Sequence, residues 1–181
     1  MLVCSAVQEF QTGTGACLLR VMAGPGGVER VELNPEGPPP GVQDDTYPVI
    51  REALYQLREY FAGRLFRFDL PLAMIGTGFQ QRVWHSLLEI PYGDTRSYGE
   101  IAARIGDAKA VRAVGAANGR NPIAIVVPCH RVIGANGKLV GYGGGLGMKR
   151  MLLHLEAEFR AAAGPEGDPP RGDAANRSDL C

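Results

Sequence analysis

The sequence predicts an α+β protein in which a strand-rich first third precedes a mainly helical remainder. Short runs rich in Val and Leu recur at hairpin spacing up to residue 33, which is typical of an antiparallel meander. Beyond residue 73 the apolar residues recur at helical spacing and follow two capping-box sequences. We therefore predict an N-terminal α+β domain over residues 1–72, a helical domain over 73–160 and a disordered tail over 161–181.

Three strands are predicted at the start of the N-terminal domain, because clusters of Gly, Pro and Thr separate three short apolar runs. The expected strands cover residues 2–10, 15–23 and 27–33.

A helix and one more strand complete this predicted domain. After a proline-rich loop over residues 34–43, Asp45 or Thr46 is expected to open a helix that ends at Gly63. The apolar residues of 65–70 favour a final strand before the chain enters the second domain.

Two capping boxes open the first two helices of the second domain. They are Thr77-Gly78-Phe79-Gln80 and Ser97-Tyr98-Gly99-Glu100, and the second helix is expected to run through Ile105. Gly106-Asp107 then ends one helix and caps a third over residues 108–118. The inward face of the first of these helices is expected to carry Phe79, Val83, Trp84, Leu87 and Leu88.

The tight turn between the second and third helices is the helix-turn-helix arrangement that presents its second helix to DNA. Spacing alone leaves a helical hairpin without a DNA role equally open. The third helix carries the large basic side chain of Arg112 among small residues that permit close approach to a surface. These small residues are Ala110, Ala113, Gly115, Ala116 and Ala117.

Asn136-Gly137 predicts a two-residue hairpin turn between segments 131–134 and 138–142.

The last helix follows a glycine-rich loop and carries Glu156 on its apolar face. A buried carboxylate needs a partner, and His130 and Arg131 are the candidates, although a boundary glutamate that reaches solvent is the alternative.

Charge is uneven along the chain. Residues 73–160 carry eleven Lys/Arg against six Asp/Glu, and between 108 and 155 there are seven basic residues and no acidic one. Such a stretch is a suitable footprint for a polyanion such as DNA. A solvated basic face without a ligand is the alternative at this stage.

Composition excludes several other classes. No run approaches the roughly 18 apolar residues of a membrane span, and the basic start of a signal peptide is missing. The four cysteines are far apart and lack a CxxC pair, so we expect free thiols, no metal and a cytoplasmic location, or a nuclear one in a eukaryote. Neither a dinucleotide fingerprint nor a P-loop is present, so no cofactor is expected.

Cys129 is the candidate nucleophile, because Pro128-Cys129-His130-Arg131 places a thiol beside a base at the exit of the apolar run 123–127. A neighbouring imidazole or cationic side chain is expected to lower the thiol pKa from about 8.5 toward neutrality. With Glu156 as an orienting group, this set has the logic of a cysteine hydrolase. Adjacency of Cys and His counts against that function, since neighbouring side chains in an extended segment point to opposite faces.

The segment from Asn121 to Gly134, NPIAIVVPCHRVIG, resembles the active-site signature of the O6-alkylguanine-DNA alkyltransferases, which repair DNA by direct reversal. The resemblance extends over residues 78–157, about half of the chain, and includes Ser97-Tyr98 and Gly141-Tyr142-Gly143-Gly144. The order of elements in the first domain is similar to the ribonuclease H-like domain of that family. The resemblance also implies a winged helix-turn-helix-like second domain.

This resemblance implies a role for each matching residue. Cys129 would accept the alkyl group from O6-alkylguanine irreversibly, with His130 as its base through a bridging water and Glu156 as the residue that orients the imidazole. Tyr98 would give a proton to the departing guanine.

The resemblance also implies how the flipped guanine is held. Main-chain groups of Cys129 and Val132 and the amide of Gly143 would recognise the base. Tyr142 would form a wall of the pocket, and Asn121 would brace the turn before the active-site segment.

The implied partner is double-stranded DNA that contains O6-alkylguanine, bound by a monomer. Arg112 would fill the space left by the flipped nucleotide. Ala113, Ala117, Tyr98 and Lys109 would also contact DNA, in the minor groove or at the backbone.

Some positions depart from the family pattern. Cys4 and Cys17 lack partner histidines, and Asp69-Leu70 stands where some relatives have a zinc-binding histidine, so no zinc is expected. Ala124 replaces a proline found in some members, and Gly143-Gly144-Gly145 is a glycine-rich wall, so the range of alkyl sizes and activity on O4-alkylthymine stay open. A non-catalytic alkyltransferase-like lesion sensor is the main alternative, and it is disfavoured because such proteins lack the reactive cysteine.

Overall fold

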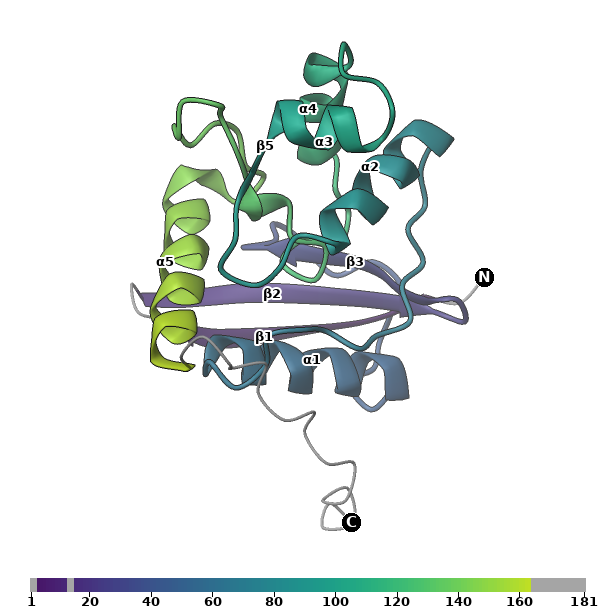
Figure 1. Cartoon of the computed structure of the whole chain (residues 1–181). Helices are drawn as coiled ribbons and strands as arrows, with labels where there is room; N and C mark the ends of the chain where they lie inside the picture. The colour runs from purple at the N-terminus through teal and green to yellow at the C-terminus, as the bar shows by residue number, and fades with distance from the viewer. Residues whose placement is uncertain (1–2, 13–14, 164–181) are drawn as a thin grey trace.

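The computed structural model describes residues 3–12 and 15–163 as a mixed α+β fold (Figure 1). The strands are β1 (Cys4–Thr12), β2 (Gly15–Gly24), β3 (Gly27–Leu33), β4 (Val42–Gln43), β5 (Arg96–Ser97) and β6 (Val132–Ile133). The helices are α1 (Pro48–Phe61), α2 (Gly78–Leu88), α3 (Tyr98–Arg104), α4 (Val111–Gly119) and α5 (Gly145–Ala163), with a 3₁₀ turn over Cys129–Arg131.

The N-terminal sheet has the strand order β3-β2-β1-β4, and its first three strands form the predicted antiparallel meander. Leu2, the predicted first strand residue, lies outside the described residues. The short strand β4 was not predicted, because only backbone pairing defines it within the proline-rich loop. Strand β4 pairs in parallel with β1, and Val42 N–H donates to the Val3 carbonyl at 3.1 Å.

Helix α1 covers one side of this sheet and begins later than predicted. Pro48 occupies its first turn, where a missing N–H costs nothing, and Tyr47 precedes it without a side-chain cap. Thr46 does not cap the helix, since its N–H and hydroxyl donate to the Asp44 carboxylate at 2.9 and 2.6 Å in the preceding loop. The predicted end is confirmed at Gly63, which has a φ of +70°.

The prediction of a strand over residues 65–70 is wrong, because this segment has no regular secondary structure. Side chains from α1 and from the loop after α2 hold it in place. Gln56 accepts from Asp69 N–H at 2.8 Å and donates to the Asp69 carbonyl at 2.9 Å. Phe68 packs on Tyr60, with ring centroids 5.4 Å apart, and Phe66 packs on a second tyrosine. The Gln56 bonds satisfy backbone groups that a strand would have paired.

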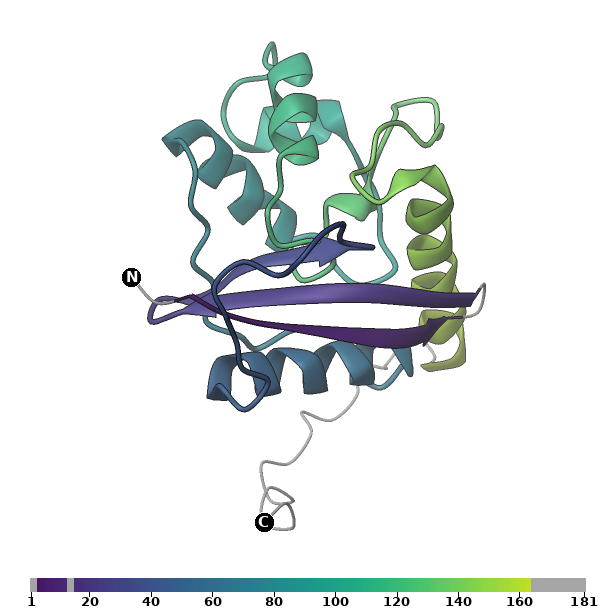
Figure 2. The same ribbon diagram turned by 180° about the vertical axis from the view of Figure 1, so that it is seen from behind.

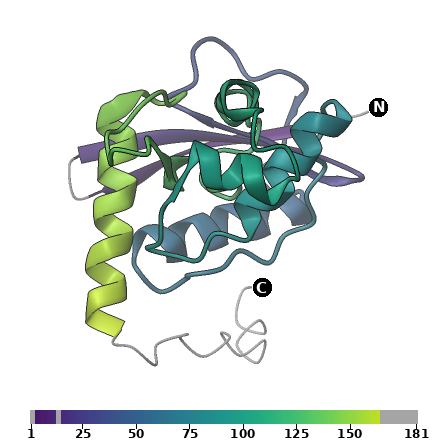
Figure 3. The same ribbon diagram turned by 45° about the horizontal axis from the view of Figure 1, so that its top comes forward.

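The helical half of the chain lies along the β3 edge of the sheet. Val31 N–H donates to the Pro122 carbonyl at 3.0 Å, and Ala124 N–H donates back to the Val31 carbonyl at 3.2 Å. In Figures 1 and 2 the strands run between α1 below and α2, α3 and α4 above, and Figure 3 shows α5 upright at one side. The segment that leads to Cys129 is therefore paired directly with the N-terminal sheet.

Both predicted capping boxes are confirmed. Thr77 and Gln80 exchange bonds of 2.8 and 3.3 Å, and Ser97 and Glu100 exchange bonds of 2.7 and 3.2 Å. Leu88 was predicted to face inward, but it is 41% exposed because α2 ends at this residue.

Helix α4 starts at Val111 and not at the predicted residue 108. Ala108 and Lys109 form a turn instead, in which Lys109 N–H donates to the Asp107 carboxylate at 3.2 Å. The tight connection between α3 and α4 nevertheless agrees with the prediction.

The predicted hairpin is only partly formed. The turn at Asn136-Gly137 exists, with Gly134 N–H bonded to the Lys138 carbonyl at 2.9 Å. Residues 138–142, however, form no strand, and β6 pairs in parallel with β5.

Helix α5 continues to Ala163, so the predicted tail begins too early, and residues 164–181 lie outside the described part of the chain. Within the described part, no helix combines the length and apolar character needed to cross a membrane.

Strand β3 also pairs with residues 71–73, because Val28 N–H donates to the Pro71 carbonyl at 2.8 Å and Ala73 N–H donates to the Val28 carbonyl at 2.8 Å. This pairing can be tested at Gly27, which has a φ of +117° and whose added Cβ would lie 2.2 Å from the Pro71 carbonyl oxygen. Gly27→Ala is expected to lower the free energy of unfolding by about 4 kcal/mol or more. Gly15→Ala is the matched control, because Gly15 has a φ of +131° and no atom within 4 Å of an added Cβ. The control should lose only the backbone strain of about 1–3 kcal/mol. If urea unfolding shows equal losses of the free energy of unfolding for Gly27→Ala and Gly15→Ala, the close approach of Gly27 to the Pro71 carbonyl is contradicted.

Candidate active site

Cys129 sits at the start of a one-turn 3₁₀ helix that follows a strained apolar segment. Ile125 is fully buried and has a φ of +70°, a conformation that a β-branched residue adopts rarely and at a cost of about 1–3 kcal/mol. Two tight turns, from Val126 N–H to the Ala124 carbonyl and from Cys129 N–H to the Val127 carbonyl, are each closed by a 2.8 Å bond. Backbone strain is thus stored next to the nucleophile.

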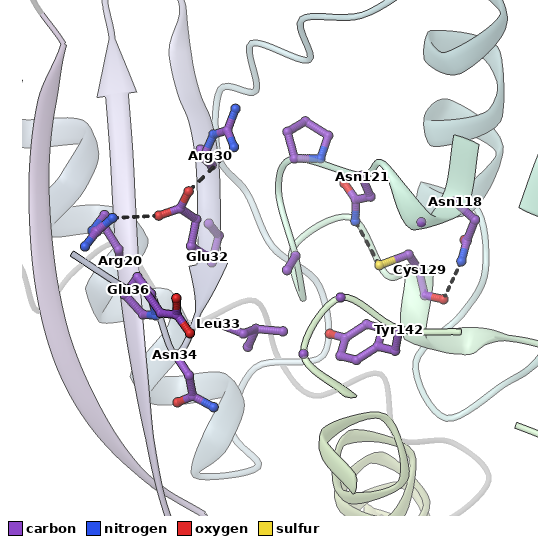
Figure 4. A pocket seen from close by; sticks show the side chains of 17 residues that line it. Arg20, Arg30, Glu32, Leu33, Asn34, Glu36, Asn118, Asn121, Cys129 and Tyr142 are labelled. Atoms are coloured by element: carbon purple, nitrogen blue, oxygen red, sulfur yellow. Dashed lines mark hydrogen bonds and ion pairs between the residues drawn. The ribbon is translucent and has the colours of Figure 1, made fainter. Parts of the chain in front are cut away.

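Two asparagines hold Cys129 in place (Figure 4). Asn121 Nδ2 donates to the Cys129 Sγ at 3.0 Å and to the Val127 carbonyl at 2.8 Å, while its Oδ1 accepts from Ile123 N–H at 3.0 Å. Asn118 Nδ2 donates to the Cys129 carbonyl at 3.3 Å. Asn121 therefore connects the end of α4 to the sulfur itself, and Asn118 is a contact that sequence reasoning missed.

Glu156 lies fully buried behind the cysteine turn, with both partners that the sequence predicted. Its Oε1 accepts from His130 Nε2 at 2.7 Å, and its Oε2 accepts from Arg131 Nε at 2.9 Å. Two further donors were not predicted, namely Tyr60 Oη at 2.7 Å and Gly93 N–H at 3.0 Å. The interpretation of Glu156 as a solvent-reaching boundary residue is excluded.

The surroundings of Glu156 and His130 determine their charge states. Burial alone would raise the pKa of Glu156, but His130 and Arg131 outweigh it and hold the pKa well below its usual range. Burial lowers the pKa of His130 more than Glu156 raises it, so the imidazole is neutral near pH 7. An ionised carboxylate only accepts, so Nε2 of His130 carries the proton. Its Nδ1, which has no protein partner among the described residues, is left as a proton acceptor.

The Cys129 thiol is protonated at rest. Burial raises its pKa, and the hydrogen bond from Asn121 and the charge of Lys149 lower it only in part. The neighbouring histidine was expected to lower the thiol pKa, but a neutral, buried imidazole supplies no positive charge. No hydrogen bond joins the His130 imidazole to the Cys129 sulfur in the described residues, so this base must reach the thiol indirectly.

Lys149 is a buried charge that sequence reasoning missed. Its Nζ donates to the carbonyls of Val132 at 2.6 Å, Val140 at 2.9 Å and Gly141 at 3.3 Å. Burial lowers the pKa of Lys149, and an ionised Cys129 would oppose that shift. Because Lys149 precedes Glu156 by seven residues, the helical periodicity that placed Glu156 inward would also have found Lys149.

Tyr98 lies beside this lysine at the start of α3, half-buried. Its hydroxyl donates to the Val140 carbonyl at 3.1 Å, and the Lys149 Nζ lies 5.9 Å from its ring centroid. Burial, and then the nearby Cys129, raise the pKa of Tyr98, so the phenol keeps its proton near neutral pH.

The predicted DNA-contacting residues divide between the surface and the core. Lys109, Arg112 and Ala113 are exposed at or near the start of α4. Ala117 is 2% exposed, because its turn of α4 packs on α2, where Trp84 Nε1 donates to the Ala117 carbonyl at 2.9 Å. Contact of the Ala117 side chain with DNA is therefore excluded in this conformation.

A cavity of about 400 Å³ opens beside Cys129. Four of the predicted substrate-binding residues line it, namely Cys129, Asn121, Tyr142 and Gly143. Val132 is buried and is not part of its lining. Across residues 3–12 and 15–163, no group of three or more His, Cys, Asp or Glu side chains is arranged to hold a metal ion.

The chain is similar in sequence to known methyltransferases. A sequence model described as "6-O-methylguanine DNA methyltransferase, DNA binding domain" matches residues 78–158. The methylated-DNA--protein-cysteine methyltransferase of Methanosarcina acetivorans is 67% identical over 106 residues, which is 59% of this chain and 68% of the relative. The chain belongs to this methyltransferase family. The Mycobacterium tuberculosis relative of the same name is 68% identical over 104 residues, which is 58% of this chain and 63% of the relative.

Solved structures of the family extend the similarity to both halves of the chain. The crystal structure of Mycobacterium tuberculosis OGT in complex with DNA has a TM-score of 0.73 and 48% identity over 88% of this chain and 94% of that chain. The O6-methylguanine-DNA methyltransferase from Pyrococcus kodakaraensis has a TM-score of 0.55 at 21% identity, which shows a common fold.

The charge assignment can be tested with Glu156→Gln. Removing one partner of a buried ion pair is expected to lower the free energy of unfolding by about 3–5 kcal/mol at pH 7. The unfolded carboxyl has an ordinary pKa of about 4.3 and the folded one a lower pKa, so this contribution is present above pH 4.3 and is lost as the pH falls. The difference in the free energy of unfolding between wild type and Glu156→Gln should be about 1 kcal/mol smaller at pH 3.5 than at pH 7.

Glu158→Gln is the matched control, because this exposed glutamate lies on the same helix and pairs only with His154 in the described residues. It should change stability by less than about 0.5 kcal/mol at either pH. If urea unfolding shows that the free-energy difference between wild type and Glu156→Gln does not change with pH, the lowered pKa of Glu156 is refuted.

Proposed function

We propose that this protein repairs DNA by direct reversal, transferring the alkyl group of O6-alkylguanine irreversibly to its own Cys129. The observation that carries the proposal is a protonated thiol at the edge of a cavity, with a neutral histidine and an ionised glutamate behind it. The family relationship and the DNA complex of a structural relative support DNA as the partner.

Proton removal is the first step. His130 Nδ1 takes the thiol proton through a bridging water, since no direct bond joins the two groups in the described residues. Glu156 fixes the imidazole through Nε2 and stabilises the imidazolium that forms. Arg131 remains as the permanent counter-charge of Glu156 when His130 is neutral.

Alkyl transfer follows by displacement at a saturated carbon. The sulfur electron pair forms the S–C bond as the C–O6 bond breaks, and its electrons pass to the guanine. Tyr98 donates its proton to the base, which leaves neutral, and the proton held by His130 balances the one given by Tyr98. No step regenerates a thiol from the resulting thioether, so each molecule reacts once.

Main-chain groups are proposed to recognise the flipped guanine. The Val132 carbonyl accepts one printed donor, Lys149 Nζ, and a carbonyl has two lone pairs, so it can accept another bond from the base. The Cys129 carbonyl already accepts from Asn118 Nδ2 and from Val132 N–H, so a bond from the base there would replace one of these two. Gly143 contributes an amide near O6, and Tyr142 forms a wall of the pocket.

Helix α4 is proposed to dock in the minor groove of double-stranded DNA. The exposed Ala113 permits close approach, Lys109 contacts the backbone, and Arg112 fills the stack when the nucleotide leaves it. Gly115 faces Tyr98, with 3.8 Å between an added Cβ and the ring, so the helix adjoins the proton donor.

The finer architecture belongs to the same proposal. We assign residues 1–72 to a ribonuclease H-like domain and 73–160 to a winged helix-turn-helix-like domain, acting as a monomer. The tight turn between α3 and α4 supports the second assignment. The substrate implies a location where DNA is found, in the cytoplasm or, in a eukaryote, the nucleus.

Transfer to Cys129 can be distinguished from lesion sensing and from hydrolysis by incubation with duplex DNA that carries a labelled O6-methyl group. We expect one label per protein molecule on Cys129, found by peptide mass analysis, and none on Cys129→Ser. Tight binding without label would indicate a sensor, and repeated turnover on an ester or peptide would indicate a hydrolase. Cys17→Ser is the control, because burial raises the pKa of Cys17 to about 11 and this thiol should not react.

The proposed role of Arg112 predicts a substrate-dependent defect. Arg112→Ala should slow transfer from duplex DNA by about tenfold or more and should affect reaction with the free alkylated base much less, because only the duplex requires flipping. Arg150→Ala, at an exposed arginine on α5, is the control for general charge loss. Equal losses on both substrates in single-turnover kinetics would contradict the flipping role.

A further inference from the structure

One hydrogen-bond donor to Glu156 comes from the N-terminal half of the chain. Tyr60, on α1, is fully buried, and its hydroxyl donates to Glu156 Oε1 at 2.7 Å. Aromatic rings hold Tyr60 in place, because the ring centroids of Phe61 and Phe68 lie 5.4 Å from its own and that of Tyr92 lies 5.9 Å away. The packing of the ring therefore does not depend on the hydroxyl, and a phenylalanine at this position can keep it.

We propose that Tyr60 is a positioning residue for alkyl transfer: its hydroxyl offsets part of the charge of Glu156, so that His130 stays neutral and free to accept the thiol proton. This inference rests on the proposed function and adds to it a residue of the N-terminal half. Tyr60 lies outside residues 78–158, over which the family's sequence model matches.

Tyr60 and His130 bind the same carboxylate oxygen. Oε1 of Glu156 accepts from the Tyr60 hydroxyl and from His130 Nε2 at 2.7 Å each, and from Arg131 Nη2 at 2.9 Å. Oε2 accepts from Arg131 Nε at 2.9 Å and from Gly93 N–H at 3.0 Å. A carboxylate offers about four lone-pair sites, so these donors compete for them. The loss of one donor leaves more of the negative charge to the others.

Burial makes this competition matter for His130. Tyr60, His130 and Glu156 are all fully buried, so solvent does not screen the carboxylate from the imidazole. Without the Tyr60 hydroxyl, Glu156 would stabilise a protonated His130 more strongly. Burial, and then Glu156, raise the pKa of Tyr60 well above its usual range, so the hydroxyl keeps its proton and remains a donor.

Charged neighbours of His130 act from its own turn and from α5. Burial lowers the pKa of His130 most, Glu156 raises it, and the charges of Arg131 and Lys149 lower it further. Cys129 is the adjacent titratable group, and its thiol is protonated because burial raises its pKa. None of these groups changes when the Tyr60 hydroxyl is removed, so a change in His130 reports on Glu156.

Two other tyrosines lie near Glu156, namely Tyr92 before β5 and Tyr142 before α5. The hydroxyls of both are buried and have no protein partner among the described residues. Of the three tyrosines, Tyr60 is therefore the one whose hydroxyl bonds to Glu156 within the described part of the chain.

The test measures the protonation of His130 by NMR titration of histidine-labelled protein, with the exposed His85 and His154 as internal references. The pKa of His130 should be higher in Tyr60→Phe than in wild type, because Glu156 then holds the imidazolium more strongly. His130 acts as a base only while it is neutral, so transfer is lost as the pH falls through this pKa, and a raised pKa moves the loss to higher pH.

The same shift should appear in single-turnover transfer from duplex DNA with O6-methylguanine. The ratio of the rate at pH 8 to the rate at pH 6 should be about fivefold larger in Tyr60→Phe than in wild type, with similar rates at pH 8. A loss of packing alone would lower the rate at both pH values by the same factor. Tyr60→Met also lacks a donor to Glu156 and should raise the pKa of His130 as well, so the test does not depend on one variant folding.

Tyr92→Phe is the matched control, because it removes a hydroxyl without a protein partner in the described residues from the same aromatic cluster. Its His130 pKa and its rate ratio should equal those of wild type. An unchanged His130 pKa in Tyr60→Phe, or equal shifts in Tyr60→Phe and Tyr92→Phe, would overturn the inference. Failure of wild type to transfer methyl to Cys129 would instead overturn the proposed function, and the NMR titration would still decide the effect of Tyr60 on His130.

Discussion

The buried carboxylate of Glu156 is the constraint on which the rest of the site depends. It accepts hydrogen bonds from α1 through Tyr60, from the loop before α3 through Gly93, and from the cysteine turn through His130 and Arg131. A single ionised group thus joins both halves of the chain to α5. Because an unpaired buried charge is strongly unfavourable, all of these segments must be in place together.

This arrangement explains why the site combines a protonated thiol with a neutral base. Arg131 balances the charge of Glu156, so His130 can stay neutral and retain its capacity to accept a proton. Burial raises the pKa of Cys129 and keeps its thiol protonated. A thiol that is not ionised at rest is less exposed to oxidation, which suits a protein proposed to react only once.

The N-terminal half contributes to the site as well as to stability. Strand β3 pairs with the segment before Cys129 through Val31, and the next inward position, Leu33, reaches the cavity beside the thiol. The strained φ of Ile125 lies within this paired region, where burial and backbone bonds hold it. Sequence similarity is concentrated in residues 78–158, yet one wall of the cavity comes from outside that range.

Local signals in the sequence determined much of this protein. They include the strand meander, both capping boxes, the candidate nucleophile Cys129 and the inward Glu156 with its partners, because turn chemistry, caps and periodicity act over a few residues. Tertiary structure decided what depends on distant contacts. Gln56 and aromatic packing overrode the apolar pattern of residues 65–70, and α2 packing buried Ala117. Burial raised the pKa of Cys129, which had been expected to fall, and the structure also showed that Lys149 is buried beside the site. Neither could be predicted, because desolvation depends on which segments meet in space.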